Sequence, residues 1–332
     1  LPNDREGQPG QIVPEINYTD ENILSIKVET RPYKIQGSTG QQDLEIADSP
    51  ISMEQIETEL AKITGDTFTA NTVTGRKVSA RYHKGTEFPV MISGGQHANE
   101  TTGVVGTLRA AQVLNQQKDS HFTISPLENP DGYALHQRLI KDNPHHMHHA
   151  ARYTALGDDL EYRIKGEFYE KEIRHKAREI SQAQLHINLH GYPSHEWTRP
   201  LSGYVPRGFD MWTIPKGFFL ILRHSADEKW TAYSEEFVHL VTLKLIKIPG
   251  VLAFNDEQVE LYRKHAGETN FRIINSFPCL ISQGKPEDIP MQLITEYPDE
   301  TIYGDHFITG HDVQTATVLA AYEVHQLLSS NQ

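Results

Sequence analysis

Two polar residues directly after a predicted strand have the types and spacing to hold a metal ion. The β-rich run 88–93 leads into Gly94-Gly95, and His97 and Glu100 follow, three residues apart, at the expected start of a helix. Residues with this spacing lie on the same side of a helical turn, within reach of one ion. Strand ends are also where open α/β sheets bind ligands. The pair is therefore a candidate for part of a metal site, although many H-x-x-E pairs are ordinary surface residues.

A second predicted strand supplies a third candidate ligand. Residues 184–189 place their even-numbered side chains on one face, and His190 follows, immediately before Gly191. Two histidines and one glutamate, with a fourth position left for water, form the ligand set of a catalytic rather than a structural zinc site. The alternative is a core histidine bonded to a backbone carbonyl. That interpretation suits His186 better than His190, because His186 lies deeper in the strand.

A third predicted strand ends in a carboxylate. Residues 292–295 form this strand, and Glu296 follows it directly. A carboxylate in such a place can take a proton from a water molecule whose pKa a metal has lowered. Glu296 alone would be unremarkable, but with His97, Glu100 and His190 it completes a set of groups suited to hydrolysis.

The elements that must position these residues alternate along the chain, which predicts an α/β fold with a mixed central β-sheet flanked by helices on both faces. We expect one catalytic domain over residues 51–332 and an N-terminal extension over residues 1–50, in which residues 23–30 are typical of an edge strand. The expected helices are 52–65, 100–115, 168–183, 227–247, 256–265 and 312–328, and the expected strands are 72–82, 88–93, 122–127, 184–189 and 292–295.

The composition excludes several classes of protein. A formal charge of −13 over 332 residues argues against a nucleic-acid partner, and no apolar run approaches the roughly 18 residues of a membrane span. The single cysteine, Cys279, allows neither an internal disulfide nor a thiolate metal cluster. We expect a soluble protein. Its compartment, cytoplasmic or exported, stays open because the chain starts at Leu1 rather than at Met, and its oligomeric state stays open as well.

Several motifs, taken in order, resemble the zinc metallocarboxypeptidases of the carboxypeptidase A type. The matching segments are TGRKV at 74–78, GGQHANE at 94–100, NPDGY at 129–133, LHG at 189–191 and TE at 295–296. Together they cover about residues 51–328. Each motif is short, but their shared order, spacing and placement at strand ends make a chance agreement improbable.

The resemblance implies a zinc-dependent hydrolase of peptide bonds that binds one zinc ion. It assigns His97, Glu100 and His190 as zinc ligands and Glu296 as general base and proton shuttle. It also implies an arginine that polarises the scissile carbonyl. Arg152 is the best match, and the alternative is that it is a surface cation. The catalytic tyrosine of the family has no secure counterpart here; the candidates are Tyr262 and Tyr303.

One segment departs from the family pattern. A G-x-D-x-N-R-N-like segment supplies an Asn-Arg pair that clamps the substrate's terminal carboxylate, whereas residues 157–163 here read GDDLEYR. Glu161 and Tyr162 occupy the Asn-Arg places, and a glutamate would repel a carboxylate. Arg163 lies one residue out of register, which can turn a side chain to the opposite face. Arg163 and Arg199 are candidate substrate-binding residues, and Arg207 and Arg223 are further substitutes.

Three alternatives to a peptidase stay open. The first is an aspartoacylase or succinylglutamate desuccinylase-like amidohydrolase acting on small N-acyl amino acids, a branch with a similar first motif. The second is a non-catalytic metal-binding pseudo-enzyme, and the third is a metal site in the histidine tract 145–149. The NPDG motif favours a peptidase, retention of Glu296 argues against a binder, and flexible clustered histidines lack the fixed geometry that catalysis needs. The expected partner is a peptide or amide substrate.

Overall fold

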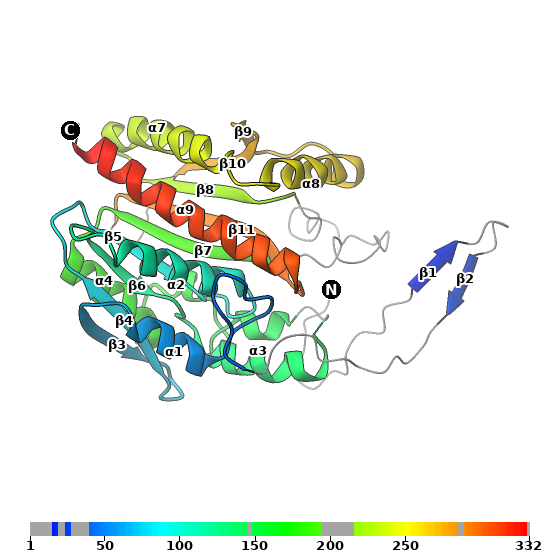
Figure 1. The fold of residues 1–332 in the computed structure, drawn as a ribbon, viewed down its shortest axis with the longest axis horizontal. Helices are drawn as coiled ribbons and strands as arrows, with labels where there is room; N and C mark the ends of the chain where they lie inside the picture. The colour runs from blue at the N-terminus through cyan, green and yellow to red at the C-terminus, as the bar shows by residue number, and fades with distance from the viewer. Residues whose placement is uncertain are drawn as a thin grey trace.

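The main body of the protein is a nine-stranded sheet with helices on both faces (Figure 1). This arrangement confirms the expected α/β fold with a mixed sheet. The computed structural model describes residues 15–18, 24–27, 40–144, 148–193, 216–284 and 289–330.

The centre of the sheet is parallel, and both flanks contain antiparallel pairs of strands. Its order is β3-β4-β6-β5-β7-β11-β8-β10-β9. The strands are β3 (Asp66–Asn71), β4 (Lys77–His83), β5 (Val90–Gly94), β6 (Phe122–Ser125), β7 (Leu185–Pro193), β8 (Phe219–His224), β9 (Arg272–Ile274), β10 (Phe277–Gln283) and β11 (Met291–Glu300). Strands β6, β5, β7 and β11 run parallel to one another, so their carboxyl ends meet at one edge. Strand β8 runs antiparallel to β11.

Most of the helices cover one face of this sheet. The helices are α1 (Met53–Ala61), α2 (Thr102–Leu114), α3 (Pro130–Asp142), α4 (Glu172–Ser181), α7 (Glu228–Leu245), α8 (Val251–Ala266) and α9 (Asp305–Ser330), with 3-10 turns η1 (His149–Arg152), η2 (Leu160–Tyr162) and η3 (Tyr169–Lys171). Buried residues of α1, α2, α7 and α9 form one large core with the apolar side of β5, β7 and β11. Helix α4 packs on the opposite face, where its Ala177 lies in a small cluster with Met91.

Alternation along β7 separates this core from a polar face. Leu185, Ile187 and Leu189 belong to the large core. The even-numbered His186 and His190 point to the other face, since successive side chains of a strand alternate. His190 is thereby presented on the face opposite the large core. The strands are longer than predicted: β7 continues to Pro193 and β11 to Glu300, so His190 and Glu296 lie within their strands rather than directly after them.

Several predicted elements are confirmed, and others differ from the prediction. Ser52 caps α1 by accepting a hydrogen bond from the Gln55 N–H at 3.1 Å. The predicted strand 72–82 is shorter, because a turn closed by the Gly75 N–H and the Thr72 carbonyl precedes β4. The prediction also missed the strands β3, β8, β9 and β10 and the helix α3.

The described residues before position 51 form a separate small sheet and also add to the large core. Strand β2 (Leu24–Lys27), inside the predicted edge strand, pairs antiparallel with β1 (Glu15–Tyr18) in a separate two-stranded sheet, not with the nine-stranded sheet. Further along, Leu44 and Ala47 are buried in the large core. None of the helices described by the structure combines the length and apolar character that a membrane crossing requires.

Two buried neutral histidines make the fold sensitive to acid. His325 is buried and accepts a hydrogen bond from the Tyr233 hydroxyl at 2.7 Å, and burial lowers its pKa to about 4. His311 donates from Nε2 to the Ala47 carbonyl at 2.9 Å, and burial lowers its pKa to about 4 as well. Both rings are therefore held in the neutral form in the folded chain.

We expect the free energy of unfolding to fall as the pH decreases from about 6.5 to about 4. In this window the two histidines become protonated in the unfolded chain but stay neutral in the folded chain. Each histidine thereby lowers the free energy of unfolding by an amount on the order of 3 kcal/mol. Urea unfolding of the wild type and of His325→Gln between pH 7.5 and 4.5 measures the effect. The variant should show a shallower dependence, and the exposed His239→Gln serves as control. Equal slopes in wild type and His325→Gln would contradict the assignment.

Candidate active site

A single turn after β5 brings His97 and Glu100 together. The strand ends at Gly94, and the Glu100 N–H donates to the His97 carbonyl at 3.1 Å, just before α2 begins at Thr102. The chain is thus already turning at these two residues, and both side chains are directed to the same side. The predicted proximity of this pair is present in the structure, although Glu100 precedes the helix rather than opening it.

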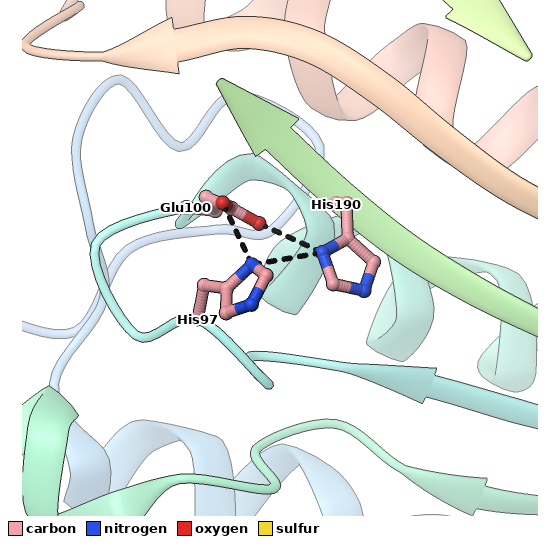
Figure 2. A group of neighbouring side chains, drawn as sticks. All are labelled: His97, Glu100 and His190. Atoms are coloured by element: carbon pink, nitrogen blue, oxygen red, sulfur yellow. Dashed lines mark hydrogen bonds and ion pairs between the residues drawn. The ribbon is translucent and has the colours of Figure 1, made fainter. Parts of the chain in front are cut away.

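Strand β7 adds His190 to this pair (Figure 2). The His97 Nδ1 atom lies 2.9 Å from Glu100 Oε1, and the His190 Nδ1 atom lies 3.0 Å from Glu100 Oε2. The two Nδ1 atoms are 3.0 Å apart. All three side chains are buried. Three ligand atoms from two distant parts of the chain therefore converge on one point.

The donor set fits a divalent cation such as zinc. Two imidazole nitrogens 3.0 Å apart cannot form a hydrogen bond when neither carries a proton. Both lone pairs can, however, bind one metal ion together with the carboxylate. Among the described residues, His97, Glu100 and His190 are the one group of at least three histidine, cysteine or acidic side chains with such closely spaced ligand atoms. Imidazole and carboxylate ligands suit zinc and do not exclude other divalent ions.

Glu296 lies beside this group because of strand register. In the parallel pairing of β11 with β7, Glu296 is directly opposite His190, so the two side chains share a face. The carboxylate is buried, and its Oε2 atom has no hydrogen-bond partner among the described residues. Burial, followed by the negative charge of Glu100, raises the pKa of Glu296 well above its usual range. The raised pKa makes the Glu296 carboxylate a stronger proton acceptor.

Asp159, which sequence reasoning did not single out, contacts His97, one of the three candidate ligands. Its Oδ2 atom lies 3.1 Å from His97 Nε2, the ring nitrogen that faces away from the convergence point. Burial alone would lower the pKa of His97, but Glu100 and the hydrogen bond to Asp159 raise it. A histidine ligand whose other ring nitrogen donates to a carboxylate is a common arrangement in metal sites, because the carboxylate fixes the ring and makes it more basic.

Replacing Asp159 with Asn should weaken zinc binding by about 10–100-fold, since an amide orients the ring without adding negative charge. Competition with a chromogenic chelator measures the dissociation constant directly. Asp158→Asn is a suitable neighbouring control, because Asp158 pairs with Arg163 rather than with a ligand. Unchanged zinc affinity in Asp159→Asn would show that Asp159 does not support the ligand.

Arg152 also reaches the ligand group. One of its terminal nitrogens donates to Glu100 Oε1 at 2.7 Å, and another lies 3.6 Å from Asp159 Oδ2. The side chain keeps 25% of its surface exposed, so it is not an isolated surface cation. Its guanidinium thus contacts both Glu100 and Asp159 at the candidate site.

Of the two candidate substrate-binding arginines, the structure describes one, Arg163. Arg163 is buried and its guanidinium is engaged within the chain, by Asp158 at 2.6 Å, by Glu170 at 3.1 Å and by the Phe168 carbonyl at 2.9 Å. Arg199, like Arg207, lies outside the described residues.

The remaining candidates lie elsewhere in the structure. The Tyr303 hydroxyl donates to the Pro144 carbonyl at 2.9 Å, and Tyr262 is buried near the Lys216 ammonium. His186 is buried with its Nε2 atom 2.7 Å from the Ser93 hydroxyl. In the histidine tract, 145–147 lie outside the described residues, and His148 Nε2 donates to the Asn143 carbonyl at 2.7 Å.

Comparisons with known proteins agree with the motif pattern. The family model described as zinc carboxypeptidase matches residues 52–195. This range includes His97, Glu100, Arg152 and His190, whereas Glu296 lies beyond it. No curated protein sequence matches the chain significantly.

Three of the solved structures that match this chain have the following descriptions. A metallo-carboxypeptidase from Burkholderia cenocepacia is 16% identical over 84% of this chain and 70% of that chain, with a TM-score of 0.49. A metallo-carboxypeptidase from Pseudomonas aeruginosa is 13% identical over 84% and 69%, with a TM-score of 0.48. A succinylglutamate desuccinylase/aspartoacylase from Rhodobacter sphaeroides is 11% identical over 79% and 65%, with a TM-score of 0.44.

The family match confirms the resemblance drawn from the motifs and supports a zinc hydrolase. Four of the residues assigned from the motifs lie inside it. Residues 52–195 carry the sequence pattern of the zinc carboxypeptidase family.

Proposed function

We propose that this chain is a zinc-dependent hydrolase of peptide bonds, acting as a metallocarboxypeptidase with Glu296 as general base. The observation that carries the proposal is the position of Glu296 directly opposite His190, with an unpartnered buried carboxylate oxygen beside three convergent ligand atoms. A structural metal site has no use for such a carboxylate.

The proposed ligands are His97, Glu100 and His190. A zinc ion held there supplies Lewis acidity, which polarises a carbonyl and makes water a better nucleophile. Glu296 takes the proton from the attacking water as the oxygen bonds to the carbonyl carbon. The same carboxyl then delivers that proton to the leaving nitrogen as the C–N bond breaks. Arg152 stabilises the negative charge that develops on the carbonyl oxygen, and Asp159 holds the His97 ring in place.

The direct test is to incubate the zinc-loaded protein with a diverse peptide mixture and to identify the products by mass spectrometry. A chelator-treated sample is the control. Chelator-sensitive loss of single residues from carboxyl termini is the expected result. Internal cleavage would keep a zinc peptidase and replace the exopeptidase assignment. No chelator-sensitive cleavage would reject the peptidase, and tight zinc uptake without turnover of any amide would indicate a non-catalytic binder.

A second candidate is an amidohydrolase that acts on small N-acyl amino acids. The observation in its favour is the loss of the Asn-Arg carboxylate clamp, because Glu161 and Tyr162 stand in those places. Rates measured side by side on a peptide and on N-acetylated amino acids distinguish the two candidates. A kcat/KM higher on the N-acyl amino acids would replace the peptidase assignment.

A further inference from the structure

Glu161, which departs from the family pattern, is neutralised by two arginines. Arg223 of β8 donates to Glu161 Oε1 at 2.5 Å, and Arg174 of α4 lies 3.4 Å from Glu161 Oε2. Burial would raise the pKa of Glu161, but the charges of the two arginines lower it to about 2. Both carboxylate oxygens of Glu161 thus contact arginines. Glu161 is therefore not available to bind a positively charged substrate.

The two arginines differ in how many of their N–H groups are engaged within the described part of the chain. Arg174 is buried and donates from Nε to both oxygens of Glu128, at 3.0 and 2.9 Å. Arg223 exposes 34% of its side chain, and within the described part of the chain Glu161 is its one charged or hydrogen-bonded partner. A guanidinium carries five N–H donors in a planar fork. Arg223 therefore keeps donors for a second carboxylate.

Arg223 faces the same side of the sheet as the proposed zinc ligands. It is opposite Gln292 in the antiparallel pairing of β8 with β11, and Gln292 is opposite His186 in the pairing of β11 with β7. Because His186 and His190 share a face, Arg223 shares that face with His190 and Glu296. The charge of Glu161 also acts on His190, where it partly offsets the lowering of the imidazole pKa by burial.

Apolar side chains lie on this face between the arginine and the general base. Ile221 and Ile294 lie opposite each other and pack in one cluster with Tyr192 and Phe219. An ion pair formed beside apolar side chains is screened less than an ion pair in open solvent.

We propose that Arg223, held in position by Glu161, binds a carboxylate of the substrate in place of the missing Asn-Arg clamp. This inference rests on the proposed function and adds the class of substrate, a peptide whose carboxyl-terminal residue is anionic. The carboxylate has two sources, the α-carboxylate of the terminal residue or an acidic side chain on it. Arg223 contacts substrate in this assignment, and Glu161 is a positioning residue.

The test uses four tripeptides that separate the two sources: Ala-Ala-Glu and Ala-Ala-Gln, each as free acid and as carboxyl-terminal amide. The zinc-loaded wild type should cleave the peptides that carry the recognised carboxylate with the higher kcat/KM. Arg223→Gln should reduce that preference by about 10–100-fold, mainly through KM, because a charge-assisted hydrogen bond is lost. Arg223→Lys should retain part of it. A preference for free acid over amide identifies the α-carboxylate, and a preference for Glu over Gln identifies the side chain.

The matched control is Arg272→Gln. Arg272 also lies on a strand and donates to a glutamate, Glu235, at 2.6 Å, but it belongs to β9 at the outer edge of the sheet. This variant should leave all four rates unchanged. If Arg223→Gln reduces the rates of all four peptides equally, Arg223 has a structural role and the inference is wrong. It is equally wrong if none of the four rates changes.

Binding separates failure of this inference from failure of the proposed function. Calorimetric titration of Ala-Ala-Glu into zinc-loaded Glu296→Gln, with and without Arg223→Gln, does not require turnover. Binding that depends on Arg223 supports the inference even if no peptide is cleaved, in which case the proposed function alone has failed. Cleavage with binding that is independent of Arg223 overturns the inference and leaves the hydrolase intact.

Discussion

Glu296→Gln is expected to lower kcat/KM for hydrolysis by about 10²–10⁴-fold while leaving zinc binding unchanged. The amide has nearly the shape of the carboxylate but cannot accept and return a proton. Glu296 does not belong to the convergent ligand group, so the three ligand atoms should keep their positions. The measurement pairs steady-state kinetics on a cleaved peptide with the zinc content of the purified variant.

The control for this prediction is Glu323→Gln, an exposed glutamate on α9 that pairs with Lys244. It should have wild-type activity and zinc content. Full activity in Glu296→Gln would remove Glu296 from the mechanism. Loss of zinc together with activity would make it a ligand instead, which would contradict the arrangement described above.

The sequence predicted that the three candidate ligands lie together, because each of them is tied to a regular element. His97 and Glu100 follow a strand at helical spacing, and His190 lies in the alternating strand β7, on the same face as His186. These patterns fix the face on which a side chain lies. In a parallel sheet they also fix the edge, so three ligands at strand ends must lie near one another. The position of Glu296 follows from the same rule.

The contacts that were not predicted involve residues in segments without such periodicity. Asp159 and Glu161 belong to the 3-10 turn η2 and its preceding residue, where neither alternation nor helical spacing indicates a direction. Their partners are distant along the chain, such as Arg223 for Glu161 and His97 for Asp159. The sequence alone indicated that Glu161 would repel a carboxylate. The folded structure shows that Glu161 instead pairs with Arg223.

Two missed elements did leave signals in the sequence. Helix α3 begins at Pro130, directly after Asn129, whose side-chain oxygen accepts the Gly132 N–H at 2.9 Å. Asn before Pro is a helix start signal, although no helix was expected at this position. Strand β8 overlaps the apolar run 217–222, for which no strand was expected. A short apolar run has no periodicity of its own that identifies a buried strand.

Arg152→Gln is expected to lower kcat by about 10²–10³-fold, with a smaller change in KM, if Arg152 stabilises charge that develops only during the reaction. Arg152→Lys should recover part of the rate, since it keeps the positive charge but loses the planar fork. Steady-state kinetics on one peptide compares all three proteins. Equal losses in the Lys and Gln variants would mean that geometry, and not charge, is the contribution of Arg152.

Zinc affinity separates this role from a structural one. Arg152 donates to Glu100 Oε1, an atom that also contacts His97 Nδ1, so the arginine competes with a cation for the electrons of that carboxylate. Removing it should therefore leave zinc affinity unchanged or raise it, while the rate falls. A variant that loses zinc in proportion to its rate would show that Arg152 serves only to hold Glu100 in place. A fall in rate without a loss of zinc affinity is what distinguishes a group that acts on the substrate from one that supports the ligand.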